Sequence, residues 1–315
     1  MVNILPEYFE SNESQIDIQV VLATYNGEKY LTEFLESLLK QQRVHIRLLV
    51  SDDGSTDGTM KILESFLPKF DEFRIVFGPQ KGPAANFYSL LRQASGDYIA
   101  LADQDDIWEP QHLINSIQRI DRYSAQPEMS YSSTITFGDP ESSGIIWPKS
   151  DPIERGLIPI FQNYARGCTI VINRSALALL TEISPKKEVM HDWWIYIMIY
   201  IFGEVRFGLE PEVRYRIHEN NTVGLGKVDP FRALRVIRNR TWQPYSQLME
   251  FESIVKSNSN NERARLISTI TDAIHGSIKN RIRLILGKQR FRDTIFGEIK
   301  IRFIFLFFPL LRLTY

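Results

Sequence analysis

The chain has 315 residues, of which 43% are hydrophobic, enough to bury the core of one large domain with an appendage. Cys168 is its sole cysteine, which excludes an intrachain disulfide framework and favours a reducing, cytosolic compartment. The formal net charge is only -1, but residues 229–315 contain 16 Lys and Arg against 7 Asp and Glu, a balance of +9 that leaves -10 for the preceding part.

The N-terminal residues show no targeting pattern. Residues 1–15 lack a basic segment followed by an apolar core, and no run of about twenty apolar residues occurs in the chain. We therefore expect neither a secretion signal nor a helix that spans a membrane.

Short apolar runs alternate with helical patterns over about the first 125 residues. Residues 16–24 (IDIQVVLAT) are rich in β-branched side chains and predict a buried strand, and Leu and Phe recur at helical spacing in residues 28–40. Three further pairs follow: RLLVSDD with MKILESFL, RIVFG with ANFYSLLRQA, and YIALAD with a helix that Pro110 opens. This repetition predicts an α/β fold, a mostly parallel sheet with helices on both faces.

Ligands of such open sheets bind at the carboxyl ends of the strands. The loops expected there are TYNGE, DDGSTDG, PQKGPAAN and DQDD. Two of them are acidic, and none is the glycine-rich phosphate loop of dinucleotide or Walker sites. A conventional dinucleotide site is therefore disfavoured.

Three aspartates are packed into four positions at 103, 105 and 106. Like charges at one strand end are costly unless a cation or hydrogen-bond donors compensate them. Mg²⁺ or Mn²⁺ prefers carboxylate oxygens and usually shares its shell with substrate phosphates, which points to a nucleoside diphosphate complex. Alternatively, the aspartates only cap the helix that begins near Pro110.

Six segments in order resemble the family 2 glycosyltransferases of the GT-A fold, from about Val20 to Gly226. They are VVLATYNGEKYL, VSDDGSTDGT, GDYIALADQDDIW, RGCTIVINRSAL, MHDWWIYI and YRIHENNTVG. The last two look most like bacterial rhamnosyltransferases of cell-wall or capsular polysaccharide synthesis, although Ile217 stands where Gln is usual. The resemblance implies a GT-A catalytic domain over residues 1–228 and a helical extension over 229–315.

The resemblance places the nucleotide at the first two strand ends. Thr24 and Tyr25 would lie at the base, with Tyr25 as a stacking face, and Asp53 beside Asp52 would accept the N3 proton of a pyrimidine. An ordinary packed aromatic and an ordinary turn with a helix cap are the alternatives.

The next loops would hold the diphosphate and the donor sugar. Lys81 and Asn86 could reach phosphate or nucleotide oxygens, although Lys81 could equally be a solvated lysine. Asp103 is expected to contact ribose or sugar hydroxyls and Asp106 the donor sugar, while Asp105 ligates the Mn²⁺ or Mg²⁺ that neutralises the leaving diphosphate.

Later residues would complete the reaction. The candidate general base is Asp192, at the start of an apolar helix, where it could also be only an N-cap. His218 could join the metal site, or be a surface or packing residue. Trp193 and Trp194 could shape the acceptor pocket or anchor the core. Alternation suggests a solvated face for Arg214 and Arg216, and Cys168 is expected in a packed strand.

The basic C-terminal part ends in IRFIFLFFPLLRLTY, too short an apolar run to span about 30 Å of hydrocarbon. Basic amphipathic segments bind anionic lipid surfaces, so an acceptor carried on a lipid at the inner face of the plasma membrane would be met there by a peripheral cytoplasmic enzyme. Packing onto the catalytic domain or self-association into a homo-oligomer is the alternative, and nucleic acid is disfavoured.

The resemblance implies an inverting, metal-dependent glycosyltransferase that moves a sugar, preferably from dTDP-rhamnose, to a hydroxyl of a glycan, which the basic C-terminal part suggests is lipid-linked. A UDP-hexose donor is the first alternative. A nucleotidyltransferase is less favoured because LATYNGEKY lacks a basic glycine-rich loop, and a non-catalytic glycan- or membrane-binding protein remains a further alternative.

Overall fold

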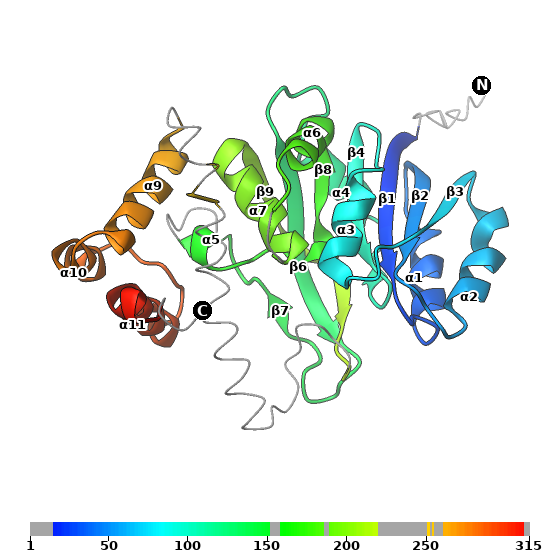
Figure 1. Ribbon diagram of the computed structural model, residues 1–315. Helices are drawn as coiled ribbons and strands as arrows, with labels where there is room; N and C mark the ends of the chain where they lie inside the picture. The colour runs from blue at the N-terminus through cyan, green and yellow to red at the C-terminus, as the bar shows by residue number, and fades with distance from the viewer. Residues whose placement is uncertain are drawn as a thin grey trace, which may run out of the picture.

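The structure is a computed structural model that describes residues 15–151, 158–185, 189–219, 251–252, 254 and 261–311. The predicted α/β class is confirmed: one curled nine-stranded sheet is flanked by helices on both faces (Figure 1). Along the sheet the strands follow the order β3-β2-β1-β4-β8-β6-β9-β5, and β7 pairs with β6.

The first half of the sheet is parallel, as the alternating pattern predicts. Each amphipathic helix crosses from one strand to the next, which brings the carboxyl ends of the four strands to one edge. The elements of this half are β1 (Ile16–Thr24), α1 (Leu31–Leu38), β2 (Val44–Asp52), α2 (Thr59–Phe66), β3 (Glu72–Phe77), α3 (Pro83–Leu91) and β4 (Tyr98–Asp103).

The second half is mixed, which the expectation of a mostly parallel sheet did not include. Strand β8 runs antiparallel to β4 and β6, β6 and β9 are parallel, and β5 and β7 are antiparallel edge pairings. These elements are β5 (Ile107–Trp108), α4 (His112–Gln118), β6 (Glu128–Phe137), β7 (Ile146–Trp147), α5 (Ile158–Phe161), β8 (Val171–Asn173), α6 (Arg174–Glu182), α7 (His191–Phe202) and β9 (Glu204–Arg216).

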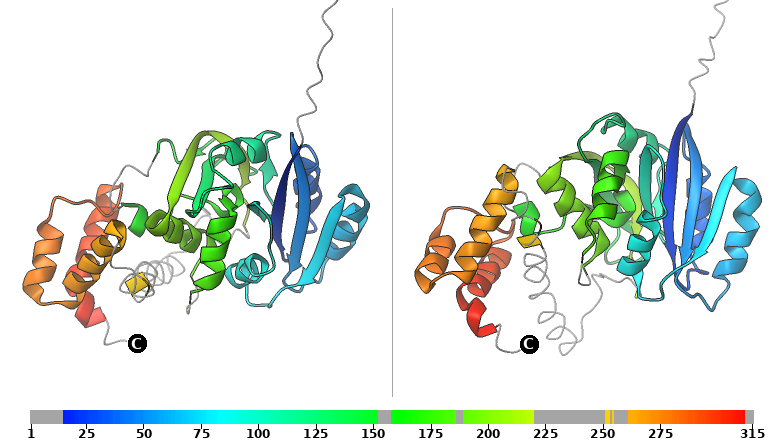
Figure 2. Two further views of the ribbon diagram at one scale, coloured as in Figure 1. Left: turned by 90° about the horizontal axis from the view of Figure 1, so that it is seen from above. Right: turned by 45° about the horizontal axis from the view of Figure 1, so that its top comes forward.

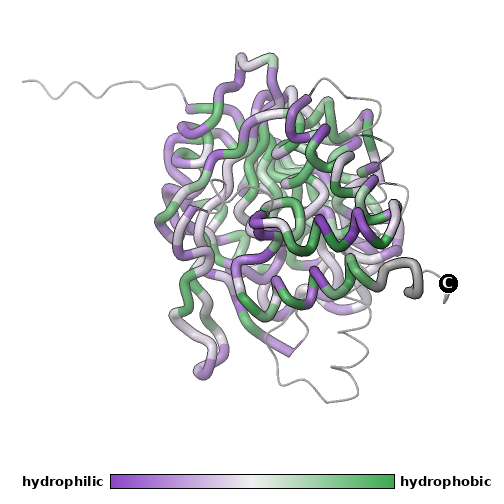
Figure 3. Tube along the Cα trace, turned by 90° about the vertical axis from the view of Figure 1, so that its left-hand side faces the viewer, coloured by the Kyte–Doolittle hydropathy of each residue, from purple (hydrophilic) through white to green (hydrophobic). Residues whose placement is uncertain are grey.

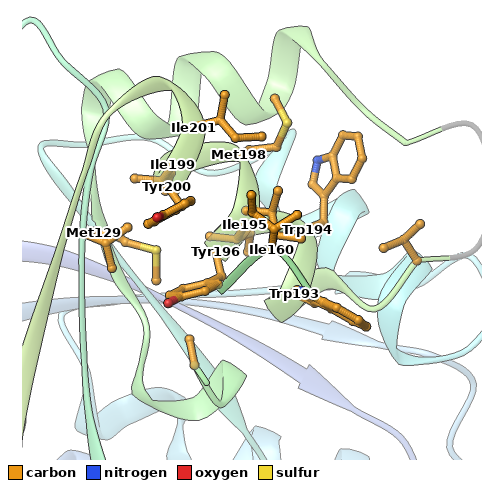
Figure 4. Close-up of a cluster of buried hydrophobic side chains, with 14 of the residues drawn as sticks. Met129, Ile160, Trp193, Trp194, Ile195, Tyr196, Met198, Ile199, Tyr200 and Ile201 are labelled. Carbon is orange, nitrogen blue, oxygen red and sulfur yellow. The ribbon is translucent and has the colours of Figure 1, made fainter. Parts of the chain in front are cut away.

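Successive residues of a strand point to opposite faces, and the two faces of the sheet accordingly bury two separate cores. Val20 and Leu22 pack with α1, α2 and α4, whereas Val21 packs with α3, α5, α6 and α7. The second core is the larger, because α7 is apolar on nearly every side and lies inside it (Figure 4).

The C-terminal helices are α9 (Glu262–His275), α10 (Ile278–Leu286) and α11 (Ile295–Leu311). They pack against one another at the end of the molecule away from β3 (Figures 1 and 2), and their buried side chains join the same core as α7. The predicted boundary at residues 228 and 229 lies outside the described residues. Among the residues that the structure describes, no helix is both long and apolar enough to cross a membrane.

Candidate active site

The ends of β1 and β2 are joined by buried hydrogen bonds. Thr24 and Asp52 are register partners, and the Thr24 hydroxyl donates to Oδ1 of Asp52 at 3.0 Å. Oδ2 of Asp52 accepts the amides of Gly54 and Ser55 at 3.1 and 2.8 Å. Asp52 is 3% exposed, so its carboxylate shapes the turn after β2 and supports the loop from beneath.

Asp53 holds the loop that follows β3. Its Oδ1 accepts the Gln80 amide at 2.6 Å and its Oδ2 accepts the Gly82 amide at 2.9 Å. A carboxylate oxygen can accept a second hydrogen bond, so a base edge remains a feasible partner. Lys81 is exposed between these two amides, and the buried Asn86 donates to the carbonyl of Ser51 at 2.9 Å.

Tyr25 lies on the surface of the same edge, with 58% of its area exposed. Gln104 holds it from the far loop: the Tyr25 amide donates to Oε1 of Gln104, and Nε2 of Gln104 donates to the Tyr25 carbonyl, both at 2.9 Å. This reciprocal pair ties the loop after β1 to the acidic loop after β4 and presents the Tyr25 ring to solvent. An aromatic ring in that position can stack on a nucleobase.

Asp103 ends β4 and Asp106 lies three residues later. One carboxylate oxygen of each and the Cys168 sulfur lie within 4.8 Å of one another. Burial raises the pKa of Asp103 well above its usual range, helped by the charges of Asp106, Asp105 and Asp192. Burial and then the charge of Asp105 raise the pKa of Asp106 to about 7, and burial likewise raises the pKa of Cys168. The strand end is therefore crowded with like charge, as the sequence predicts.

Asp105 is contacted by the last residue of β9 and by the segment that follows it. Its Oδ2 lies 2.7 Å from Nε2 of His218, whose ring stacks on Tyr30 with the centroids 5.0 Å apart. Arg216 donates from Nε to the Asp105 carbonyl at 2.7 Å and from its amide to Oδ1 of Asp106 at 2.9 Å. Arg216 is 8% exposed and pairs with Glu33 at 2.6 Å, so the expectation of a solvated face is wrong for it.

Asp192 lies in the first turn of α7, where the polar start of the helix meets the acidic loop. Its Oδ1 accepts the Trp193 amide at 2.6 Å, and the Asn163 side chain hydrogen-bonds to its carboxylate. Burial nevertheless raises the pKa of Asp192 to about 6. Asp192 lies near the acidic cluster, because its Cβ is 3.7 Å from where a Cβ at Gly167 would be, next to Cys168, and its charge helps to raise the pKa of Asp103. A carboxylate with this pKa suits a general base near neutral pH.

Trp193 and Trp194, predicted to contact an acceptor, lie in the core instead. Trp194 is 1% exposed and stacks on Phe251 at 5.1 Å between centroids, so its ring is covered by the C-terminal part of the chain. Trp193 is 9% exposed. The burial of both rings favours the alternative, a core anchor, because α7 buries residues on all sides.

The donor set fits a hard divalent cation. Asp103 and Asp106 each offer a carboxylate oxygen within 4.8 Å of the other, and Asp105, between them in the chain, pairs with the imidazole of His218. Cys168 belongs to the same cluster, but its raised pKa keeps the thiol protonated, which makes it a poor ligand. Burial destabilises the charged forms of Asp103 and Asp106 and so raises the pKa of both. A bound cation would stabilise these charged forms.

The structure thus brings most of the predicted site residues to one edge of the sheet. Sequence patterns missed several others, because their contacts join segments that are distant in the chain: Gln104, Asn163, Arg166 and Arg216. Cys168 was expected in a strand but lies in a 3-10 turn over Gly167–Thr169, before β8 begins. An apolar run without periodicity does not distinguish the two.

Comparisons with known proteins agree with this geometry. The family described as "Glycosyl transferase family 2" matches residues 19–177. The chain is 29% identical over 248 residues to a dTDP-rhamnosyl transferase, RfbG, of Shigella flexneri, covering 70% of this chain and 81% of that protein. It is 26% identical to the putative teichuronic acid biosynthesis glycosyltransferase TuaG of Bacillus subtilis, covering 73% and 88%.

Solved structures show the same fold. The S. aureus TarS fragment 1–349, in complex with UDP-GlcNAc, aligns with a TM-score of 0.54 at 18% identity over 86% of this chain and 79% of that one. The Pyrobaculum calidifontis mannosyltransferase PcManGT, in complex with GDP-Man and Mn²⁺, aligns with a TM-score of 0.50 at 14% identity over 95% and 88%. The predicted GT-A fold is confirmed, and the chain belongs to the glycosyl transferase family 2.

Proposed function

We propose that the protein transfers L-rhamnose from dTDP-rhamnose to a hydroxyl of a lipid-linked polysaccharide precursor, with inversion at the anomeric carbon. The observation that carries the chemistry is the position of Asp192 on α7: its Cβ lies 3.7 Å from where a Cβ at Gly167 would be, and the next residue, Cys168, belongs to the cluster of Asp103 and Asp106. A base on one side of a reacting carbon and a diphosphate site on the other are what a single in-line displacement requires.

Each group has a defined task in this proposal. Asp192 accepts the proton of the attacking hydroxyl, and Asn163 and the Trp193 amide hold its carboxylate in place. Asp103 and Asp106 contact the donor sugar or ribose. Asp105 and His218 would hold Mn²⁺ or Mg²⁺, which when bound neutralises the charge of the departing diphosphate.

The nucleotide would lie along the ends of β1 to β3. Tyr25 offers an exposed ring to a base, and Asp53 offers a carboxylate to the N3–H group of thymine or uracil. The hydrogen-bonded pair of Thr24 and Asp52 would lie beneath the nucleotide. Lys81, on the adjoining loop, could pair with phosphate oxygens.

The choice of donor is supported by the similarity to RfbG and by the MHDW and YRIH segments. A UDP-hexose is the alternative, since the structural relatives with bound donors include one with UDP-GlcNAc. A nucleotidyltransferase is disfavoured because the loop after β1 contains no glycine-rich basic segment.

An acceptor on a lipid is supported by an exposed apolar face on α10 and α11. Leu286 is 77% exposed, Ile295 77% and Phe296 80%, and further exposed apolar residues continue the face at Ile278, Ile282, Ile299 and Phe303. Figure 3 shows apolar and polar positions interleaved along these helices. Exposed basic residues accompany the face: Lys279, Arg283, Lys288 and Arg290.

Apolar side chains beside cations complement an anionic lipid surface, where the apolar groups enter the interface and the cations meet the headgroups. We therefore place the enzyme peripherally at the cytoplasmic face of the membrane. Association of two copies through the same face is the alternative.

The experiment that tests the function is a donor panel. Purified protein is incubated with UDP-, GDP- and dTDP-sugars in Mn²⁺ or Mg²⁺, and the released nucleotide is measured before and after chelation. We expect metal-dependent release of dTDP from dTDP-rhamnose. Release from a UDP-hexose instead would contradict the donor, and neither release nor binding of any donor would contradict the proposed function.

A further inference from the structure

A pocket of about 200 Å³ is lined by residues at the end of β7 and by Asp293 of the C-terminal part. Its lining combines two aromatic rings with polar and charged groups: Trp147, Pro148, Lys149, Ser150, Tyr164 and Asp293. The pocket is smaller than the roughly 300–1,000 Å³ of sites for drug-sized ligands. That size suits a single ring rather than a whole nucleotide sugar.

One short segment, residues 162–166, connects the pocket to the reacting groups. Tyr164 lines the pocket, and the neighbouring Asn163 hydrogen-bonds to the carboxylate of Asp192. Two residues further, the Arg166 guanidinium lies 5.3 Å from the centroid of the Trp147 ring and 4.0 Å from that of Tyr215 on β9. The pocket and the candidate base are therefore linked through one short segment of the chain.

The pocket lies on the opposite side of these groups from the nucleotide loops. The sheet order runs from β3, β2 and β1, whose ends form the nucleotide edge, through β4 with its acidic loop, to β6 and its partner β7. Trp147 ends β7 and Asp103 ends β4. In an in-line displacement the acceptor approaches from the side away from the leaving nucleotide, and the sheet order puts β7 on that side of the acidic loop.

The lining has the chemistry of a sugar subsite. The rings of Trp147 and Tyr164 stack on each other, nearly parallel at 14° with their centroids 5.8 Å apart, and together they form the aromatic part of the lining. Lys149 can donate hydrogen bonds and Asp293 can accept them. A pyranose ring presents C–H groups on its faces and hydroxyls at its rim, which an aromatic wall with polar groups at its edge complements.

From these observations we propose that the pocket binds one neutral sugar unit of the acceptor glycan, next to the hydroxyl that is glycosylated. The inference rests on the proposed function and adds the position and the chemical class of the acceptor. The C-terminal part takes part directly, because Nε2 of Gln162 donates to Oδ2 of Asp293 at 2.8 Å and fixes that residue at the rim.

The same rim adjoins the apolar face proposed to meet lipid. Asp293 is two residues from Ile295, where α11 and its exposed apolar residues begin. An acceptor sugar in the pocket would thus lie close to the lipid surface, as expected for a sugar near the lipid anchor of the precursor.

The test compares sugar transfer with donor hydrolysis in the full-length protein. Octyl glycosides of rhamnose, glucose and N-acetylglucosamine serve as acceptor probes, and Trp147→Ala and Lys149→Ala are compared with wild type. We expect each variant to lower the ratio of transfer to hydrolysis, at least about tenfold for Trp147→Ala since a buried aromatic contact is lost, with Trp147→Phe retaining part of it.

Two controls separate the possible causes of a loss. Tyr123→Ala removes an aromatic ring that is 78% exposed and outside the pocket, and it should keep the wild-type ratio. Lys149 is exposed, so its replacement reports on the pocket even if Trp147→Ala fails to fold.

Unchanged ratios in both pocket variants would overturn the proposal, and so would a wild-type enzyme that hydrolyses its donor but glycosylates none of the probes. If the wild type releases no nucleotide from any donor, the proposed function itself fails, and the acceptor subsite fails with it.

Discussion

Nε2 of His218 lies 2.7 Å from Oδ2 of Asp105, although 113 residues separate them in the chain. The contact closes the acidic loop after β4 with the segment that leaves β9, and the stack of His218 on Tyr30 fixes the orientation of the imidazole. A carboxylate and an imidazole, both suitable ligands for Mn²⁺, thus lie side by side.

The first prediction concerns this pair. Replacing His218 with Ala should raise the Mn²⁺ concentration for half-maximal nucleotide release by at least about tenfold, the lower range for a lost interaction at a metal site. Manganese titration of the chelator-stripped protein measures the effect. His275→Ala, on α9, is the matched control and should titrate like the wild type. An unshifted titration of the His218 variant would contradict a metal-binding role.

The pH profile should report on Asp192, whose pKa burial raises to about 6. A general base must be ionised, so kcat/KM should fall about tenfold per pH unit below 6 and be level above it. The folded protein binds this proton more tightly than the unfolded chain, whose Asp pKa is about 4. Asp192 therefore contributes less to stability as pH rises from about 4 to 6.

Asp192→Asn removes that titration. Its unfolding free energy, measured in urea between pH 4 and 7, should increase relative to wild type as the pH rises through this window. A constant difference across the window would contradict a raised pKa for Asp192.

A buried cluster of charged and polar side chains around Glu212 should contribute strongly to the free energy of unfolding. Glu212, with a side chain 5% exposed, accepts hydrogen bonds from Asn115 and Arg119 and lies 3.4 Å from the buried His112. Replacing it with Ala leaves buried donors without a partner, so we expect a loss of about 3–5 kcal/mol in urea unfolding. Glu210→Ala, exposed on the same strand, should cost less than about 0.5 kcal/mol. Similar losses in both variants would contradict the assignment.

The same cluster should make the free energy of unfolding fall at acidic pH. Burial alone would raise the pKa of Glu212, but hydrogen bonds from His112 and Arg119 lower it below its ordinary value. A carboxylate with a lowered pKa stabilises the fold above its ordinary pKa, and this contribution is lost as the pH falls through the folded value. The wild type should therefore approach the stability of Glu212→Gln at acidic pH.

Membrane binding should depend on the exposed apolar face. Replacing Leu286 and Phe296 with Glu removes two large apolar groups and adds charge that anionic lipid repels. We expect at least about a tenfold weaker association with vesicles that contain phosphatidylglycerol. Leu209→Glu, at an exposed position on β9, is the matched control. Unchanged sedimentation with vesicles would contradict a lipid role for this face, and a change from dimer to monomer would favour self-association.

The parallel half of the fold could be predicted because its signals are local. The β-branched runs that became β1 and β2, and the helical spacing of α1, each arise from neighbouring residues. The loops at the strand ends then follow from topology, which is why Asp53 and Asp105 could be selected from the sequence.

The mixed half could not be predicted, for physical reasons. Strands β5 and β7 have two residues each and β8 has three, too few to show an alternation. The side chains that fix the site act across long separations: the bond from Arg216 to the Asp105 carbonyl spans 111 residues. The burial of Trp194 depends on Phe251 from the C-terminal part, and no local sequence pattern predicts this contact.

The most direct test of the proposed mechanism is the behaviour of Asp192→Asn with the preferred donor and Mn²⁺. Donor binding is measured by calorimetry and sugar transfer by product formation, with Asp272→Asn on α9 as the matched control. The proposal predicts donor affinity close to wild type and transfer lowered about 10²- to 10⁴-fold, the range expected when a general base is removed. Transfer at the wild-type rate by Asp192→Asn would contradict the role of Asp192 as the base.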